Sequence, residues 1–535
     1  MSGQAAWRHG PQAEVRMELQ KSNIHMNRLK GKVTSQLTLD EDFNLPEMKP
    51  DLARIIMQQA EIQLEASKPM EDKAAVKGKL VFSLLYSPEE GEIPEQFAGA
   101  VPFEETLNFD GLELQDHLQV KWDIEDLTLT AVNSRKLRAN AIVTLEVNAD
   151  RLYDEVAAQE VTDAGELQTL TKRLEVLQME VQKRDSFRVK EEIELTSNNP
   201  NIRQILWNSL ELRNVECKPE DEKLTLRGEL VLFAIYSGEE DHIPLQWMEK
   251  SILISGEVEC PGCRSGMVSS TRISLGHKEI EARPDYDGEN RVISVDAVLD
   301  LDIRLFEEGW VQLLCDLYQP GKKAVPKMKE AYFRSLLVKN GAKCKVVDQM
   351  KAAGEDKILQ ICHSSGSVKI DSAELVEDGL KVEGALVLQI LYMSDDDKEP
   401  LRSLEGAVPF SDVVEARGIG PDCLWEMNPV IEQLTTVMLG NDEIEVKASL
   451  NLDTLVQRNC KENVVTDVEF QPMTPEELEQ TPGIIGYIVR PEDSLWTVAK
   501  RFSTTKEIVL QTNGLATDAL KPGQRLLLVK QGEEL

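Results

Sequence analysis

The chain has 535 residues, which at about 150 residues per domain predicts three or four domains with cores of their own. It carries 60 Lys and Arg residues against 94 Asp and Glu residues, a net charge of −34. A field of this sign repels phosphate backbones and argues against nucleic acid as a partner. Hydrophobic residues make up 41% of the chain and charged residues 29%, a globular composition that excludes wholesale disorder.

Targeting segments and cysteines are informative about the compartment. The first 20 residues hold no apolar stretch before a small-residue cleavage site, so we expect no signal peptide. The longest apolar runs, such as residues 80–86, fall far short of the roughly 18 to 20 residues that cross a bilayer. Eight cysteines are too sparse for a disulfide framework in so long a chain. We therefore expect a soluble cytoplasmic protein without a transmembrane segment.

One apolar segment occurs three times. It is VKGKLVFSLLYS at residues 76–87, LRGELVLFAIYS at 226–237 and VEGALVLQILYMS at 382–394. The register aligns three sets of residues, with offsets of 150 and 156 for the first set: Gly78, Gly228 and Gly384; Tyr86, Tyr236 and Tyr392; Pro94, Pro244 and Pro400. This period exceeds the roughly 20 to 50 residues of solenoid units, so each copy is predicted to be a domain.

Each copy has the pattern of β-strands, with apolar residues in alternation or in short runs bounded by turn residues. Residues 367–388 predict a hairpin, and the copies close on alternating strands at 139–147, 295–303 and 446–455. Asn199-Pro200 predicts the start of a short helix over residues 201–206. The predicted fold class is mainly β, with three tandem sandwich- or barrel-like repeats and a small C-terminal module.

The predicted domain organisation is as follows. The repeats cover residues 30–155, 186–320 and 340–458; around them lie an N-terminal extension (1–29), connectors (156–185 and 321–339), an acidic Pro-containing linker (459–482) and a C-terminal module (483–530). The first connector fits two structures, because Leu167, Leu170, Leu174 and Leu177 have helical spacing whereas residues 174–181 nearly alternate. The sequence therefore leaves two alternatives for this connector, a helix or two further strands.

The repeated pattern resembles a known domain. A Pro-led start, a V-x-G-x-L strand ending in Tyr, a Pro in the next loop and the segment Val101-Pro102-Phe103 are similar to the SPOCS domain. That domain recurs in clostridial spore-coat assembly proteins. The resemblance covers roughly residues 30–458 and implies a role in building the spore coat.

The C-terminal module has the pattern strand, helix, helix, strand. A short strand at 486–489 precedes Asp493-Ser494, which offer capping oxygens to a helix with Leu495, Val498, Ala499 and Phe502 on its core face. A second helix over 505–511 ends at Asn513-Gly514, and the last strand covers 525–529. This predicts a βααβ fold in under 50 residues.

The ordered matches Tyr487-x-Val489, Asp493-Ser494-Leu495, Val498-Ala499, Asn513 and Pro522-Gly523-Gln524 resemble the LysM domain. LysM domains usually bind N-acetylglucosamine polymers between two loops, which here are residues 491–495 and 513–523. The resemblance, the basic character of the module and the interface preference of Trp give these candidate ligand- or partner-binding residues: Pro491, Glu492, Asp493, Ser494, Trp496, Lys500, Asn513, Gly514, Lys521, Pro522 and Gly523.

Two of these residues qualify the sugar-binding expectation. Glu492 stands where the family commonly has Gly, and a carboxylate there adds bulk and charge beside the groove. Trp496 lies beside the core stripe and is expected to be half exposed, a candidate contact for a partner.

The sequence gives no sign of catalysis, of a metal site or of a cofactor. Six scattered histidines have neither ligand spacing nor a nearby nucleophile motif. Cys260 and Cys263 supply half of a zinc site and are expected to bind no metal. Cys362 and His363 should point to opposite faces of a strand and so cannot act as nucleophile and base.

SPOCS-like domains followed by LysM resemble clostridial spore-coat morphogenetic proteins. That resemblance implies a non-enzymatic factor in the mother-cell cytoplasm, tethering coat to the forespore surface. It also implies a protein partner for the LysM module, the coat-basement ATPase SpoIVA. The alternative is a protein that binds peptidoglycan in the cell wall or cortex, and a third possibility is a bare scaffold with a vestigial LysM module.

Overall fold

The computed structural model describes residues 18–529, except residue 92, residues 163–166, 240–244, 321, 352–356, 397, 441 and 473–482. Pro244 of the repeat register and part of the predicted acidic linker therefore lie outside the described residues. Among those described, no helix has the length and apolar character needed to span a bilayer.

Each repeat is a sandwich of two antiparallel sheets, so the predicted mainly β fold is confirmed. In repeat 1 the sheets are β1 (Glu18–Asn44), β6 (Lys136–Thr162) and β5 (His117–Asn133), and β2 (Leu52–Met70), β3 (Lys73–Pro88) and β4 (Glu95–Asn108). In repeat 2 they are β7 (Gln168–Glu194), β13 (Asn290–Tyr318), β12 (Arg272–Pro284) and the short β11 (Val268–Ser269), and β8 (Ile202–Glu220), β9 (Lys223–Gly238) and β10 (Gln246–Glu259). In repeat 3 they are β14 (Lys322–Lys351), β19 (Glu443–Pro472) and β18 (Cys423–Met438), and β15 (Ile358–Val376), β16 (Gly379–Ser394) and β17 (Leu401–Glu415).

The aligned glycines lie at equivalent places on the central strands β3, β9 and β16. A Cβ at Gly78 would come within 2.7 Å of the Gln63 carbonyl, and one at Gly384 within 2.2 Å of the Lys369 carbonyl. A β-bulge in the neighbouring strand presses its backbone toward each glycine. Close backbone approach therefore explains why the three repeats share this residue.

The predicted helix over residues 201–206 is absent, and this prediction is wrong because β8 begins at Ile202. Register shifts between Ile202 and Gln204 and between Ile205 and Trp207 mark two β-bulges. These bulges bury Ile202, Leu206 and Trp207, which gives a strand the apolar spacing of a helix. Equivalent bulges occur in β2 and β15.

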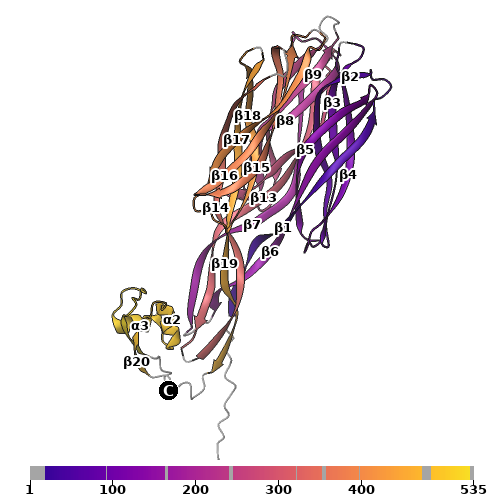
Figure 1. The fold of residues 1–535 in the computed structure, drawn as a ribbon. Coiled ribbons are helices and arrows are strands. Elements are labelled where there is room, and N and C mark those ends of the chain that lie inside the picture. The colour runs from indigo at the N-terminus through magenta and orange to yellow at the C-terminus, as the bar shows by residue number, and fades with distance from the viewer. Residues whose placement is uncertain are drawn as a thin grey trace, which may run out of the picture.

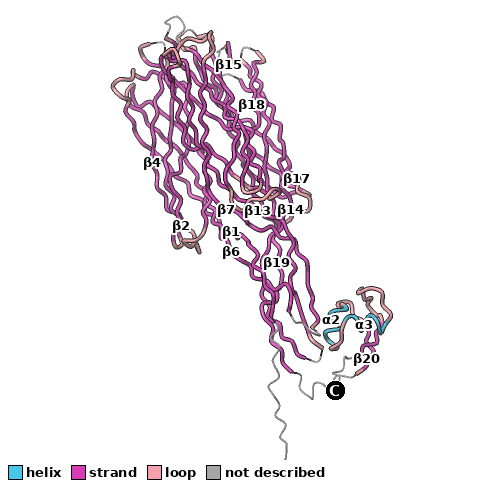
Figure 2. Tube along the Cα trace, turned by 180° about the vertical axis from the view of Figure 1, so that it is seen from behind, coloured by secondary structure: helices cyan, strands magenta, loops and turns pink. Residues whose placement is uncertain are grey.

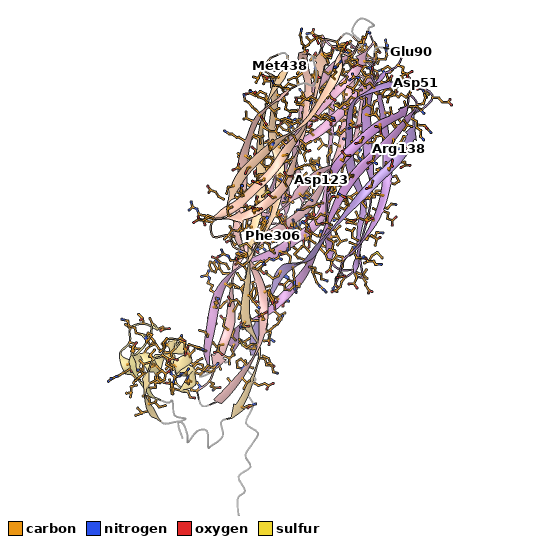
Figure 3. All side chains as sticks on the ribbon, in the orientation of Figure 1. Asp51, Glu90, Asp123, Arg138, Phe306 and Met438 are labelled. Atoms are coloured by element: carbon orange, nitrogen blue, oxygen red, sulfur yellow. The ribbon has the colours of Figure 1, made fainter. Side chains whose placement is uncertain are left out.

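In one sheet of each repeat, an edge strand and the central strand continue past the sandwich, which gives three long ribbons: β1 with β6, β7 with β13, and β14 with β19. Figure 1 shows the three repeats as a head that narrows into a stalk made of these ribbons. Phe306, labelled in Figure 3, lies where the head narrows. The stalk has its own core of Ile24, Met26, Ala157, Val176, Val311, Leu313, Ala331, Phe333 and Val464.

The first connector is therefore strand and not helix. Val176 packs in the stalk core, whereas Leu177 and Met179 pack with Phe306 in a separate cluster. Burial of β7 on both faces produced the helix-like spacing in the sequence. The prediction of a linker over residues 459–472 is wrong, because these residues form the second half of β19.

The head holds together because every repeat contacts the other two. Equivalent apolar residues of the repeats meet in one cluster that includes Ile56, Met57, Leu85, Leu206, Trp207, Ile235, Leu391 and Leu401. Polar contacts join the same surfaces: the Arg304 guanidinium donates to Glu426 at 2.7 Å, and Lys278 pairs with Glu61 at 2.8 Å. The three repeats thus form one body around a common axis.

The C-terminal module consists of β20 (Ile484–Ile488), α2 (Leu495–Arg501), α3 (Lys506–Asn513) and β21 (Arg525–Val529). Its strand-helix-helix-strand order is confirmed, and its helices are the only ones in the described part of the chain (Figure 2). Ser494 and Thr505 cap the two helices with their side chains, and Gly514 ends the second with a φ of 59°.

Candidate functional site

The two loops predicted as groove walls lie side by side. The Val489 amide donates to the Gln524 carbonyl at 2.9 Å, and the Gly523 amide donates to the Val489 carbonyl at 2.8 Å. These bonds continue the β20–β21 pairing into the loops. Seven candidate residues on these loops are exposed. The five that do not cap or end a helix we call the loop face: Pro491, Glu492, Lys521, Pro522 and Gly523.

The side chain of Asp493 holds the loop of residues 491–495 in place. Its side-chain carboxylate accepts hydrogen bonds from the Tyr487 hydroxyl and from the Arg490 amide, the latter at 2.8 Å, and lies 3.5 Å from Arg501. The hydrogen bond from Tyr487 is the main cause that lowers the pKa of Asp493, with Arg490 and Arg501 adding to it. The carboxylate is therefore ionised and engaged within the module.

Three more candidates have roles in the framework. The Asn513 amide donates to the carbonyls of Val509 and Leu527, both at 2.8 Å, and its oxygen accepts from the Leu527 amide. It thereby fastens α3 to β21. Ser494 caps α2 and Gly514 ends α3, so both residues are explained by the helix ends that they form.

Trp496 is buried, with 6% of its surface exposed, so the expected half-exposed side chain is wrong. Its indole nitrogen donates to an Asp316 carboxylate oxygen at 2.8 Å, and Asp316 lies near the end of β13 in the stalk. Lys500 donates to both oxygens of the same carboxylate, at 2.6 and 2.8 Å. One carboxylate therefore binds two of the residues that we expected to face a partner.

Tyr318 completes this contact from the same face of β13. Its ring meets the Trp496 ring edge-on, with centroids 4.9 Å apart and planes at 69°. Its hydroxyl donates to the Thr504 carbonyl at 2.8 Å. We call the surface formed by Trp496, Lys500 and Thr504 the docked face, because it fastens the module to the stalk.

Sequence analysis did not find Asp316 and Tyr318. They lie more than 170 residues before α2, and nothing in their local pattern marks a docking point. Only the folding of β13 into the stalk brings them to the module (Figure 1).

Thiols elsewhere are poor candidates for chemistry. Cys260 and Cys263 are buried in an apolar cluster, and burial raises the pKa of Cys263 to about 11. Burial likewise raises the pKa of Cys362 to about 12. Within the described ranges, no group of three or more His, Cys, Asp or Glu residues could hold a metal ion.

Cys362 and His363 do not occupy opposite environments as expected. A bulge between Ile361 and His363 turns both side chains to the same inter-repeat cluster, where His363 stacks on Phe233 with centroids 4.0 Å apart. The thiol nevertheless stays protonated at neutral pH, because its pKa lies far above 7.

Three β-sandwiches on a common stalk and a small βααβ module define a multidomain, mainly β protein. Comparison with protein families identifies these domains. The model described as "SipL, SPOCS domain" matches residues 51–132, 201–283 and 357–439, and the LysM domain model matches residues 487–529. No curated protein and no solved structure matches the chain.

The chain therefore has the SipL-like architecture of three SPOCS domains with a C-terminal LysM domain. SPOCS and LysM are non-catalytic binding and scaffold domains.

Proposed function

We propose that the protein is a non-enzymatic assembly factor of the spore coat, whose LysM domain captures a protein at the forespore surface in the mother cell. The observation that carries this proposal is the union of three SPOCS domains and a LysM domain in one chain. A coat-basement ATPase of the SpoIVA type is the partner that the resemblance to coat morphogenetic proteins suggests.

The two faces of the LysM domain differ in how accessible they are to a partner. The docked face is covered by Asp316 and Tyr318, whereas the loop face is open to solvent. Lys521 lies on the open face with Pro522 and Gly523, and Glu492 lies on the adjoining loop. Opposite charges on adjoining loops suit a protein surface with complementary charges better than a neutral sugar polymer.

A second candidate function is binding of peptidoglycan, because LysM domains usually recognise N-acetylglucosamine polymers. The neighbouring loops of the module favour it, since they lie where such a groove would form. Glu492 counts against it, because its carboxylate must lose water when a neutral sugar covers it.

Two substitutions in the full-length protein separate these functions. Lys521→Glu reverses a charge on the loop face and should lower capture of a purified SpoIVA-type ATPase about tenfold. Glu492→Gly restores the residue common in the family and should increase retention on insoluble peptidoglycan only if sugar is the ligand. Both side chains are exposed, so the fold should stay intact.

Lys461→Glu is the matched control, because Lys461 is an exposed lysine on the stalk strand β19 and outside the module. It should leave capture unchanged. Strong retention of the wild type on peptidoglycan, with no capture of the ATPase, would replace the assembly function by the glycan function.

A further inference from the structure

A cavity of about 500 Å³ lies between repeats 1 and 2, a size within the range of ligand sites. Its walls include residues 62–67 of β2 and residues 274–277 of β12, each an unbroken run. Because side chains alternate across a strand, a wall made of consecutive residues is the edge of a strand and not one of its faces. The cavity is therefore a slot between two strand edges.

Both strands are outermost in their sheets. Among the described residues, β2 pairs with β3 alone and β12 with β13 alone. No third strand pairs with the described residues 62–67 of β2 or 274–277 of β12, and an unpaired strand edge is the property that peptide-binding sheets use.

The corresponding edges at the interface of repeats 2 and 3 are closed. Between repeats 2 and 3, β8 and β18 lie in contact. The bulge of β18 leaves one residue, Glu432, without a partner in the strand pairing, and its carboxylate pairs with Lys343 at 3.1 Å. The bulge of β12 leaves two residues, Gly276 and His277, without partners in the strand pairing. Both line the cavity, and Gly276 has no side chain to fill it. The slot between repeats 1 and 2 therefore differs from the closed edges between repeats 2 and 3.

The cationic groups of the slot lack acidic partners. Arg184 donates only to neutral oxygens, the Leu118 carbonyl at 2.6 Å and the Ser67 hydroxyl at 3.2 Å. The Arg272 side chain forms no hydrogen bond or ion pair with another described residue; burial lowers its pKa, and the charge of Asp302 partly offsets this effect.

Four carboxylates also line the slot, and two of them pair with lysines outside its lining: Glu65 with Lys77 at 3.6 Å and Asp185 with Lys183 at 2.8 Å. Asp302 accepts from Gln119 at 3.4 Å and lies 4.0 Å from His117. Burial raises the pKa of Asp300. Trp122 and Leu275 complete the lining with apolar surface.

We propose that this slot binds an extended acidic peptide segment of a partner protein, which adds as a β-strand between β2 and β12. Strand edges supply backbone donors and acceptors, and Arg184 and Arg272 supply charge for an acidic side chain. A small carboxylate would engage the guanidinium groups but would leave both edges unpaired.

Fluorescein-labelled hexapeptides of alternating Val and Glu, or of alternating Val and Lys, test this by anisotropy with the full-length protein. The acidic peptide should bind saturably and the basic one should not. Arg272→Ala should weaken binding about tenfold or more. Arg283→Ala is the control, because Arg283 lies on the same strand with 53% of its side chain exposed.

Hydrogen exchange on the wild-type protein provides a second measurement that does not depend on a variant. The acidic peptide should slow exchange in residues 62–67 and 274–277. Absence of saturable binding, equal binding of the basic peptide, or equal binding by Arg272→Ala would overturn the proposal. Full competition by glutarate at the same concentration would assign the slot to a small carboxylate and would also overturn it.

Discussion

The two faces of the LysM domain differ in whether another part of the chain covers them. The docked face holds the aromatic Trp496, and the stalk covers it through Asp316 and Tyr318. The loop face holds no aromatic residue and stays open. Burial of an aromatic anchor is the usual mark of an interface, and here the interface lies within the chain. An anchor found in a sequence therefore indicates a contact but not whether its partner is another molecule.

Removal of the anchor should have the largest effect. Trp496→Ala deletes a side chain that packs in the module core and against Tyr318, and it leaves Asp316 without its indole donor. We expect a loss of about 3 to 5 kcal/mol in the stability of the module. Calorimetry of the full-length protein should show this loss, with Lys521→Ala on the loop face unchanged. An equal loss of stability in Trp496→Ala and Lys521→Ala would contradict the difference between the docked face and the loop face.

Removal of the stalk carboxylate should loosen docking without damaging the module itself. Asp316→Ala leaves the Trp496 nitrogen and the Lys500 ammonium without their partner, at a cost of about 1 to 3 kcal/mol. Limited proteolysis should then cut the joint between stalk and module faster. Asp467→Ala is the control, since Asp467 is an exposed stalk residue paired with Lys327. Unchanged cleavage in Asp316→Ala would remove the docking role.

A smaller change isolates one hydrogen bond of the docked face. Tyr318→Phe keeps the ring against Trp496 but removes the hydroxyl that donates to the Thr504 carbonyl. We expect a loss of about 1 kcal/mol in docking stability, measured as faster exchange of amide hydrogens in residues 495–505. An effect as large as that of Asp316→Ala would show that the hydroxyl, and not the carboxylate, dominates docking.

The smallest effect concerns pH and the loop face. The hydrogen bond from Tyr487 lowers the pKa of Asp493 below its ordinary value of 3.8. A lowered pKa stabilises the fold above that ordinary value, and the contribution disappears as pH falls through the folded-state pKa. The melting temperature of the module should therefore fall below about pH 4 more steeply in the wild type than in Asp493→Asn. Parallel pH profiles would contradict this.

The sequence predicted the local chemistry of the chain well. Periodicity and turn residues identified the repeated strands, and Gly78, Gly228 and Gly384 occupy the same place in each repeat. The caps at Ser494 and Gly514 also follow from local preference. Such features depend on neighbours in sequence, which a single sequence contains.

Features that depend on distant neighbours were missed. The bulges after Ile202 and Ile205 imitate helical spacing, and burial on both faces hides the long strand β7. The ribbons of 27 to 30 residues exceed the usual strand length of about 3 to 10, so the sequence suggested connectors instead. Asp316 reaches Trp496 only in the folded stalk, so the burial of that indole could not be predicted.

Hydrogen exchange of the full-length protein, with and without a purified SpoIVA-type ATPase, tests the division between the two faces most directly. We predict slower exchange in residues 490–494 and 520–524 of the loop face upon binding, with no change in residues 314–318 of the stalk or 496–500 of the docked face. Faster exchange in residues 314–318, together with protection of residues 496–500, would show that the partner displaces the stalk and takes the docked face instead.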